Sequence, residues 1–391
     1  MLRKIMVILM TAAVIGSASW APAFAEEKKP AQVDLAPNAK SAILIDADTG
    51  TVIYEKNPHE KLPPASITKV MSMLLIMEAL DEGRIKLTDM VRTSEYAASM
   101  GGSQIFLEPG EEMSVNDMLK GIAMASGNDA TVAMAEKIAG SEEMFVQMMN
   151  DKAKELGLKD THFVNTNGLP AEEHYSSAYD IAMMSRELLK HEEIIQYTSK
   201  YQDYLRQDSD NPFWLVNTNK LVRFYPGADG LKTGFTSEAK FCLAATAKRN
   251  NFRIISVVMG EPNTKTRNAE VSQLFDYAFA HYDNVPIYKK GDVIGKLKIR
   301  KAELEEMELK ADQHYSILTK KGQSPDQFTH EIVLDPKLKA PIQKDQQIGE
   351  LVVKNGDEII KKFPIKSDQA IDKATWWQLF KRTMKKMVFF D

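Results

Sequence analysis

The segment "SITKVMSMLLIMEAL" places Ser66 and Lys69 three positions apart at the start of a strongly apolar stretch. Residues three apart lie on one face of a helix, so the Lys69 amine is expected close to the Ser66 hydroxyl. Burial disfavours the charged form of a lysine and lowers its pKa, which makes the amine a usable base. A serine hydroxyl is a weak nucleophile until such a base takes its proton. The pair therefore predicts nucleophilic catalysis.

The Ser-x-x-Lys spacing is common, and it also fits a helix cap followed by a lysine whose charge reaches water. Two further stretches favour the catalytic interpretation. "MASGNDA" carries Ser126 and Asn128 between helical patterns, and "DGLKTGFTS" carries Lys232 at the start of a strand. The order and separation of the three motifs match a signature of penicillin-binding proteins and related β-lactamases.

On these motifs the chain resembles the serine-type D-alanyl-D-alanine carboxypeptidases, the low-molecular-mass penicillin-binding proteins, over nearly its whole length. Within that family it resembles a paralogue that spore-forming bacteria use in spore-cortex synthesis. The resemblance implies an α/β (α+β) fold, a mainly antiparallel sheet between helical layers, and no cofactor or metal. It implies removal of the terminal D-Ala from peptidoglycan stem pentapeptides, which limits cross-linking of the cell wall, and acylation by penicillin and other β-lactam antibiotics.

The resemblance also implies roles for individual residues. Ser66 attacks the carbonyl between the two D-alanines, and Lys69 accepts its proton, so that an acyl-enzyme forms and the last D-Ala leaves. Ser126 relays a proton toward the leaving amine. The residues implied to bind substrate are Asn128, Lys232, Thr233, Gly234, Phe235 and Arg267.

Within that set, each residue has an implied task. Asn128 holds the base lysine and the substrate amide. Lys232 attracts the terminal carboxylate and disfavours a second ammonium nearby, and Thr233 contacts the same carboxylate. The backbone N–H groups of Ser66 and Phe235 form an oxyanion hole. We expect Gly at 234 because a side chain there could obstruct the substrate as it pairs along the strand edge.

Three residues carry weaker signals. Arg267, in "NTKTRNAEV", matches an arginine that helps to bind the terminal carboxylate in similar enzymes, although a solvated arginine at a helix start is the alternative. His174 and Asp180, in "HYSSAYD", are expected to be structural, because the Ser-Lys arrangement needs no histidine base.

Other function classes fit less well. A serine β-lactamase shares the signature, but class A enzymes deacylate with a glutamate, and no Glu-x-x-Leu-Asn stretch follows Ser126. A non-catalytic peptidoglycan-binding protein would be expected to have at least one damaged motif, and none is damaged. The sequence contains no His-Glu-x-x-His stretch, so it does not indicate a metalloprotease. The net charge of -4 gives no indication of a nucleic-acid partner.

The elements that position the motifs predict a catalytic domain over residues 38–284. "SAILIDADTGTVIYEKN" indicates two strands around a turn at 48–50, and strands return in "LKTGFTSEAKFCLAATAKRNNFRIISVVMG". Helical patterns lie between them, with capping serines at Ser114 and Ser141 and one helix beginning at about Ala65. One sheet made from both ends of the region is the natural packing. Cys242, the sole cysteine, is expected to be a buried small hydrophobe.

The remaining segments predict export and attachment. Residues 1–25 have the basic start, short apolar run and small-residue cleavage site of a signal peptide, with a signal anchor as the alternative. Residues 285–368 indicate a small all-β module, with a hairpin turn at Asn355–Gly356 and no visible chemistry.

Residues 369–391 predict an amphipathic helix at the outer face of the cytoplasmic membrane. One face carries Trp376, Trp377, Phe380, Met384, Met387 and Val388. The other carries Gln378, Lys381, Arg382, Lys385 and Lys386, with Phe389 as a misfit. Such a helix suits the surface of an anionic membrane, and a helix docked on the β module is the alternative.

Overall fold

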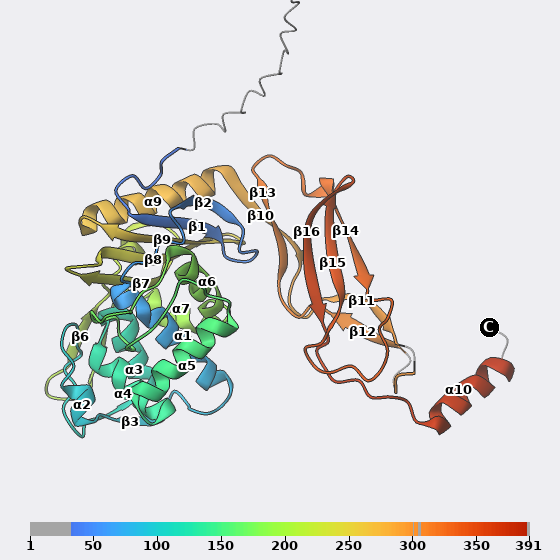
Figure 1. Ribbon diagram of the computed structural model, residues 1–391, viewed down its shortest axis with the longest axis horizontal. Helices are drawn as coiled ribbons and strands as arrows, with labels where there is room; N and C mark the ends of the chain where they lie inside the picture. Colours follow the sequence, from blue (N-terminus) through green and yellow to red (C-terminus); the bar gives the residue numbers. More distant parts are fainter. Residues whose placement is uncertain (1–32, 300, 304–305, 389–391) are drawn as a thin grey trace, which may run out of the picture. The chain divides into compact units, whose positions relative to one another are not determined.

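The computed structural model describes residues 33–299, 301–303 and 306–388, so the predicted signal peptide lies outside the described residues. The N-terminal region of the described chain builds a five-stranded antiparallel sheet in the order β2-β1-β9-β8-β7 (Figure 1). Its strands are β1 (Ser41–Asp46), β2 (Val52–Lys56), β7 (Ala228–Thr236), β8 (Lys240–Arg249) and β9 (Phe252–Glu261). The prediction that both ends of this region join one sheet is confirmed.

Helices cover both faces of this sheet (Figure 1). All residues of strand β1 are buried, but successive residues point into two different cores. Leu44 packs in the core with α9 (Thr264–His281). Ile45 packs in the core with α1 (Lys69–Asp81) and α6 (Ala178–Leu188). A strand buried on both faces needs apolar residues at successive positions. The predicted fold class is confirmed.

The segment between β2 and β7 is mainly helical. Besides α1 and α6 it contains η1 (Ala65–Thr68), α2 (Glu95–Ala98), α3 (Val115–Lys120), η2 (Gly121–Ala125), α4 (Asn128–Ala139), α5 (Glu142–Glu155), η3 (Glu192–Ile194), α7 (Ile195–Thr198) and α8 (Leu221–Phe224). The predicted caps are confirmed: the hydroxyl of Ser114 accepts from the Asp117 N–H, and that of Ser141 from the Met144 N–H. The sequence did not predict two small two-stranded antiparallel sheets, which pair β3 (Met90–Arg92) with β4 (Glu112–Ser114) and β5 (Gln202–Leu205) with β6 (Phe213–Val216).

The C-terminal region of the chain contains an all-β module, as predicted. Its strands are β10 (Tyr282–Tyr288), β11 (Val293–Lys298), β12 (Glu306–Lys310), β13 (Tyr315–Lys320), β14 (Phe328–Leu334), β15 (Gln347–Asn355) and β16 (Glu358–Lys366), with a short η4 turn (Pro325–Gln327). They share one apolar core. Asn355 pairs with Glu358, so Gly356 and Asp357 are the two turn residues, one position later than predicted.

The helix α10 (Trp376–Val388) follows this module. Its aromatic residues Trp376 and Trp377 are exposed, and Phe380 stacks on Trp376. The side chains of Lys385, Lys386 and Val388 and the whole of Phe389 lie outside the described residues. Among the residues that the structure does describe, no helix has the length and apolar character that a membrane crossing needs.

Candidate active site

The predicted nucleophile lies on a tight turn that leads into α1. Pro63 and Pro64 are followed by the 3-10 turn η1, and the α-helix proper begins only at Lys69. Ala65 adopts a left-handed conformation with φ 49, which is costly for a residue with a side chain. The helix therefore begins four residues later than predicted, and this turn leaves Ser66 half-buried while Lys69 is completely buried.

The Lys69 amine has three oxygen neighbours. Its Nζ lies 3.1 Å from the Ser66 Oγ, 2.6 Å from the Asn128 Oδ1 and 2.8 Å from the Asn167 carbonyl oxygen. Burial holds the pKa of Lys69 well below its usual range, and the positive charge of Lys232 lowers it further. The lowered pKa favours the neutral amine, and this amine lies in hydrogen-bonding reach of a serine hydroxyl, which is the geometry a general base requires.

Ser126 follows η2 and precedes α4, as the sequence predicts for the "SGN" stretch. Its backbone is left-handed, with φ 66, and its buried hydroxyl has no hydrogen-bond partner among the described residues. A buried unpaired hydroxyl and a strained backbone both cost free energy, and such costs concentrate at functional sites. Two residues later, the Asn128 Nδ2 donates to the Gly101 carbonyl, which fixes the amide that faces Lys69.

Strand β7 brings the third motif to the same site. Lys232 is buried, and its ammonium donates to the Thr233 carbonyl at 2.9 Å. Burial, helped by the positive charge of Arg267, lowers the pKa of Lys232 to about 7. The Thr233 hydroxyl bonds to the Thr218 hydroxyl at 2.7 Å.

At Gly234 the structure shows a close contact that the sequence did not predict. A Cβ at this position would lie 2.9 Å from the Pro64 carbonyl oxygen and 3.2 Å from the Ala65 Cβ. The glycine therefore lets β7 pack against the turn that carries Ser66, while its predicted role of keeping the strand edge open for substrate remains a prediction. β7 is the edge strand of its sheet, and Phe235 is exposed on it and packs on Phe241 with ring centroids 4.3 Å apart.

Arg267 lies in the first turn of α9 but is buried, so the alternative of a solvated arginine is wrong. Its guanidinium donates to the Asn268 side-chain oxygen and, at 3.5 Å, to the Cys242 carbonyl. Burial lowers the pKa of Arg267 to about 10. Cys242 is itself completely buried, and burial raises the pKa of its thiol to about 11, as expected for a structural cysteine.

His174 and Asp180 have structural contacts, in line with the prediction. His174 bonds through Nε2 to the Thr68 hydroxyl at 2.8 Å, and burial lowers its pKa to about 4. Its other ring nitrogen accepts from the Val164 N–H. Asp180 accepts from the Asp160 N–H and from a nearby threonine hydroxyl.

The sequence did not predict three contributors to the site. The Asn167 carbonyl contacts Lys69, Thr218 contacts Thr233, and Asp129 opposes the lowering of the Lys69 pKa. The stretch "NTNGL" indicates a turn, but a backbone carbonyl carries no signal of its role. Asp129 stands directly after the "SGN" motif, so its position could have suggested a supporting role.

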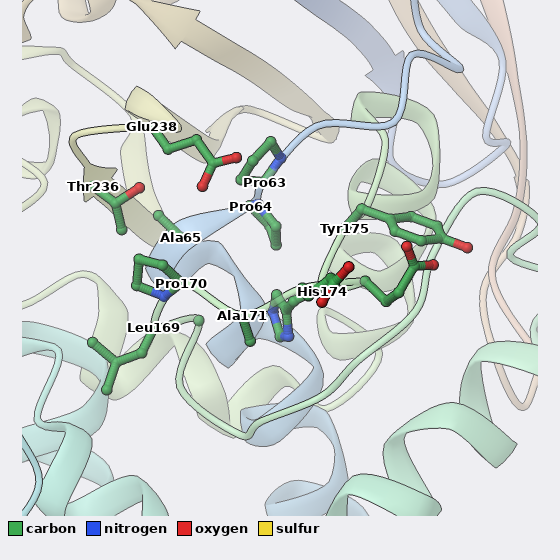
Figure 2. A pocket seen from close by; sticks show the side chains of 13 residues that line it. Pro63, Pro64, Ala65, Leu169, Pro170, Ala171, His174, Tyr175, Thr236 and Glu238 are labelled. Atoms are coloured by element: carbon green, nitrogen blue, oxygen red, sulfur yellow. The ribbon is translucent and has the colours of Figure 1, made fainter.

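A cavity of about 300 Å3 lies beside the nucleophile turn (Figure 2). Pro63, Pro64 and Ala65 line it on the side of the turn. Thr236 and Glu238 line it from the end of β7 and the loop that follows. The other lining residues are Gly168, Leu169, Pro170, Ala171, Glu172, Glu173, His174 and Tyr175.

Comparison with known families gives two matches that cover different regions of the chain. Residues 25–263 match the family model described as D-alanyl-D-alanine carboxypeptidase. Residues 282–373 match the model described as penicillin-binding protein 5, C-terminal domain. The two matches correspond to the sheet-and-helix region and the all-β module.

Individual relatives agree with these matches. The chain is 55% identical to the D-alanyl-D-alanine carboxypeptidase DacF of Bacillus subtilis over 93% of both chains. It is 32% identical to DacA of Escherichia coli K12, over 87% of this chain and 85% of that one. Penicillin-binding protein 5 of Haemophilus influenzae superposes with a TM-score of 0.71 at 31% identity, over 88% of this chain and 99% of that one.

A further solved structure bears on ligand binding. Penicillin-binding protein D2 of Listeria monocytogenes, in its ampicillin-bound form, superposes with a TM-score of 0.56 at 29% identity, over 62% of this chain and 98% of that one. With a family model matched across most of the sheet-and-helix region and a relative more than half identical along both chains, this protein belongs to the serine-type D-alanyl-D-alanine carboxypeptidases, the low-molecular-mass penicillin-binding proteins.

Proposed function

We propose that Ser66 and Lys69 perform the D-Ala-D-Ala carboxypeptidase reaction of this family. The observation that carries the proposal is the 3.1 Å separation between the Lys69 Nζ and the Ser66 Oγ at a lysine that is completely buried. The neutral amine takes the hydroxyl proton as Ser66 attacks the carbonyl between the two D-alanines. The peptide bond breaks, the terminal D-Ala leaves as an amine, and water then hydrolyses the acyl-serine ester.

The surrounding residues divide the remaining tasks. The backbone N–H groups of Ser66 and Phe235 stabilise the oxyanion, which develops only in the transition state. The buried charge of Lys232 and the Thr233 hydroxyl bind the terminal carboxylate, with Arg267 adding positive charge nearby. The unpaired Ser126 hydroxyl passes a proton to the leaving amine, and its lack of another partner among the described residues supports that role.

Ser126 offers a test with a matched control. Ser185, on α6, is also buried with a hydroxyl that no described residue pairs, but it belongs to none of the three motifs. We expect Ser126→Ala to lower kcat/KM for a D-Ala-D-Ala peptide by about a hundredfold, the usual size of a lost proton-transfer group. Ser185→Ala should leave kcat/KM unchanged. Equal activity of the two variants would remove Ser126 from the mechanism.

We also propose that the enzyme is exported and attached to the outer face of the cytoplasmic membrane through α10. The exposed aromatic side chains of Trp376, Trp377 and Phe380 on one helix favour insertion at a bilayer surface. Deleting residues 372–391 should move active enzyme from the membrane fraction to the soluble fraction. Continued co-sedimentation of the truncated enzyme with membranes would contradict the attachment, and detection of residues 1–25 on the mature protein would contradict signal cleavage.

A role in spore-cortex synthesis is proposed from the sequence resemblance alone. Immunoblots across growth and sporulation of the source organism test it, since the protein should then accumulate during sporulation. Equal amounts in vegetative cells, together with an unchanged cortex in a strain that lacks the gene, would contradict the role.

A further inference from the structure

The direction in which a substrate lies along β7 follows from the proposed function, on which this inference rests. The terminal carboxylate is placed at Lys232 and Thr233, and the oxyanion at the Phe235 N–H. A peptide that pairs with the open edge of β7 in that register continues past Thr236 with the residues that precede D-Ala-D-Ala. The cavity beside Ser66 begins at this end of the strand, because Thr236 and Glu238 line it.

The walls of this cavity suit a long side chain with a cationic end. Pro64 and Leu169 offer apolar surface near the nucleophile turn, against which a methylene stem can pack. Glu238 lies across from them, and Figure 2 shows its carboxylate pointing toward Pro63 and Pro64 over the cavity. Glu238 is exposed and makes no ion pair with any described residue.

The position of Glu238 is fixed by the β7–β8 turn. Thr236 pairs with Lys240 across the turn, and the Ala239 N–H donates to the Thr236 hydroxyl at 3.0 Å. Ala239 is also buried. The turn therefore holds the Glu238 backbone three residues beyond Phe235, whose N–H belongs to the proposed oxyanion hole, so only a long substrate side chain can reach from the strand edge to the Glu238 carboxylate.

Two other carboxylate side chains line the cavity besides Glu238. Glu172 and Glu173 are among the lining residues, and the Lys61 ammonium lies 4.8 Å from the centroid of the ring of Tyr175, which also lines the cavity. Because Glu238 lines the cavity, is exposed and makes no ion pair with a described residue, its carboxylate is available to a cation from the substrate.

We propose that Glu238 is a specificity-determining residue that binds the side-chain ammonium of the residue preceding D-Ala-D-Ala. In peptidoglycan stems that residue is a diamino acid, whose side chain combines an aliphatic stem with a terminal amine. The stem packs on the proline and leucine surface of the cavity, and the ammonium reaches the carboxylate. The enzyme thus selects, within the carboxypeptidase reaction, acyl donors that carry a free amine at this position.

Two peptides that differ only in that amine test the proposal. One is an Nα-acetylated Lys-D-Ala-D-Ala, and the other carries an acetyl group on the lysine Nε as well. Release of D-Ala gives kcat/KM for both peptides with the parent enzyme, Glu238→Gln, and Glu192→Gln as the control. Glu192 is an exposed glutamate in η3 that does not line the cavity.

We expect the parent and Glu192→Gln to prefer the free amine by about fivefold, the upper range for a partly exposed ion pair. Glu238→Gln should bring the ratio close to one by slowing the free-amine peptide alone, and added salt should reduce the parent's ratio by screening. The proposal is overturned if the parent shows no preference, if the preference persists in Glu238→Gln, or if both peptides slow equally in that variant. Failure of the parent to cleave either peptide would instead contradict the proposed function.

Discussion

The catalytic region and the β module of this enzyme differ in the ionisable side chains that they bury. The buried acidic and basic side chains of the catalytic region are Asp46, Lys69, Asp129, Glu142, Asp180, Lys232, Glu261, Arg267 and Glu270. Among the described residues of the module, no charged side chain is buried, and its buried polar side chains are Ser316, Thr319 and Ser367. Although each has an apolar core, the two regions thus differ in the charge that they enclose.

The difference indicates where the chemistry resides. Burying a charge costs free energy unless partners compensate it, so natural proteins retain buried charges where structure or function requires them. Lys69 and Lys232 lie beside the serine, where one supplies a base of lowered pKa and the other supplies a site for a carboxylate. The module keeps its charges in water, and its contribution to the reaction should be small.

The largest effect is expected from Lys69→Met, which removes the base and keeps a side chain of similar length. We expect kcat/KM for a D-Ala-D-Ala peptide to fall by about a thousandfold, within the range of general-base catalysis. The matched variant in the module, Lys354→Met, should retain full activity. Thermal melting of both variants checks folding, and near-parental activity of a folded Lys69→Met enzyme would contradict the role of the lysine.

Lys232→Met should have the next largest effect and should change the pH profile as well. Lys69 acts as a base only when neutral, so activity is present above its pKa and is lost as the pH falls through it. The charge of Lys232 lowers that pKa, and removing the charge therefore raises it. The acid limb of kcat/KM should move to higher pH, with an overall loss of about tenfold or more from the weakened carboxylate contact. An acid limb that stays in place would show that the two lysines are not coupled.

Gly234→Ala tests the packing of β7 against the nucleophile turn. An added methyl group would lie 2.9 Å from the Pro64 carbonyl, and overpacking of this kind typically costs ~1–3 kcal/mol. If the turn that carries Ser66 shifts to accommodate the methyl group, kcat/KM should fall by about tenfold, because a displaced nucleophile reacts more slowly. Gly295→Ala in the module is the control, since the nearest atom to its added carbon is 3.6 Å away. A parental kcat/KM for Gly234→Ala would contradict the expectation that the added methyl group displaces the turn that carries Ser66.

The smallest effect is expected at the module's surface ion pairs. Lys354 and Glu331 are 2.6 Å apart but partly solvated. Glu331→Gln should change the free energy of unfolding by less than about 1 kcal/mol, as is usual for exposed pairs, and should leave hydrolysis unchanged. Denaturant unfolding measures the first and the peptide assay the second. A loss of activity in Glu331→Gln would contradict the conclusion that the module contributes little to the reaction.

Much of the fold and of the site could be predicted because local patterns carry the information. Ser66 and Lys69 are three residues apart, so a helical turn alone brings them together, and the serine caps are equally local. The sheet follows from apolar runs separated by turn residues such as Asn250. The predicted domain limits and the roles of the individual site residues remain predictions.

The rest depends on tertiary contacts that no local pattern encodes. Gly234 approaches the Pro64 carbonyl closely, and Pro64 lies far away in the sequence. The Asn167 carbonyl reaches Lys69 through a loop whose path is set by packing. The left-handed backbone of Ala65, and with it the late start of α1, could not be expected from a residue that favours helices.

Intact mass spectrometry of the parent and Ser66→Ala tests the central claim most directly. Each purified mature protein is exposed to penicillin and, separately, to a peptide ending in D-Ala-D-Ala. We expect the parent to gain one penicilloyl group and to remove one alanine from the peptide, while the variant does neither. An adduct on the variant, or a folded parent that neither gains the adduct nor trims the peptide, would contradict the assignment of Ser66 as the nucleophile.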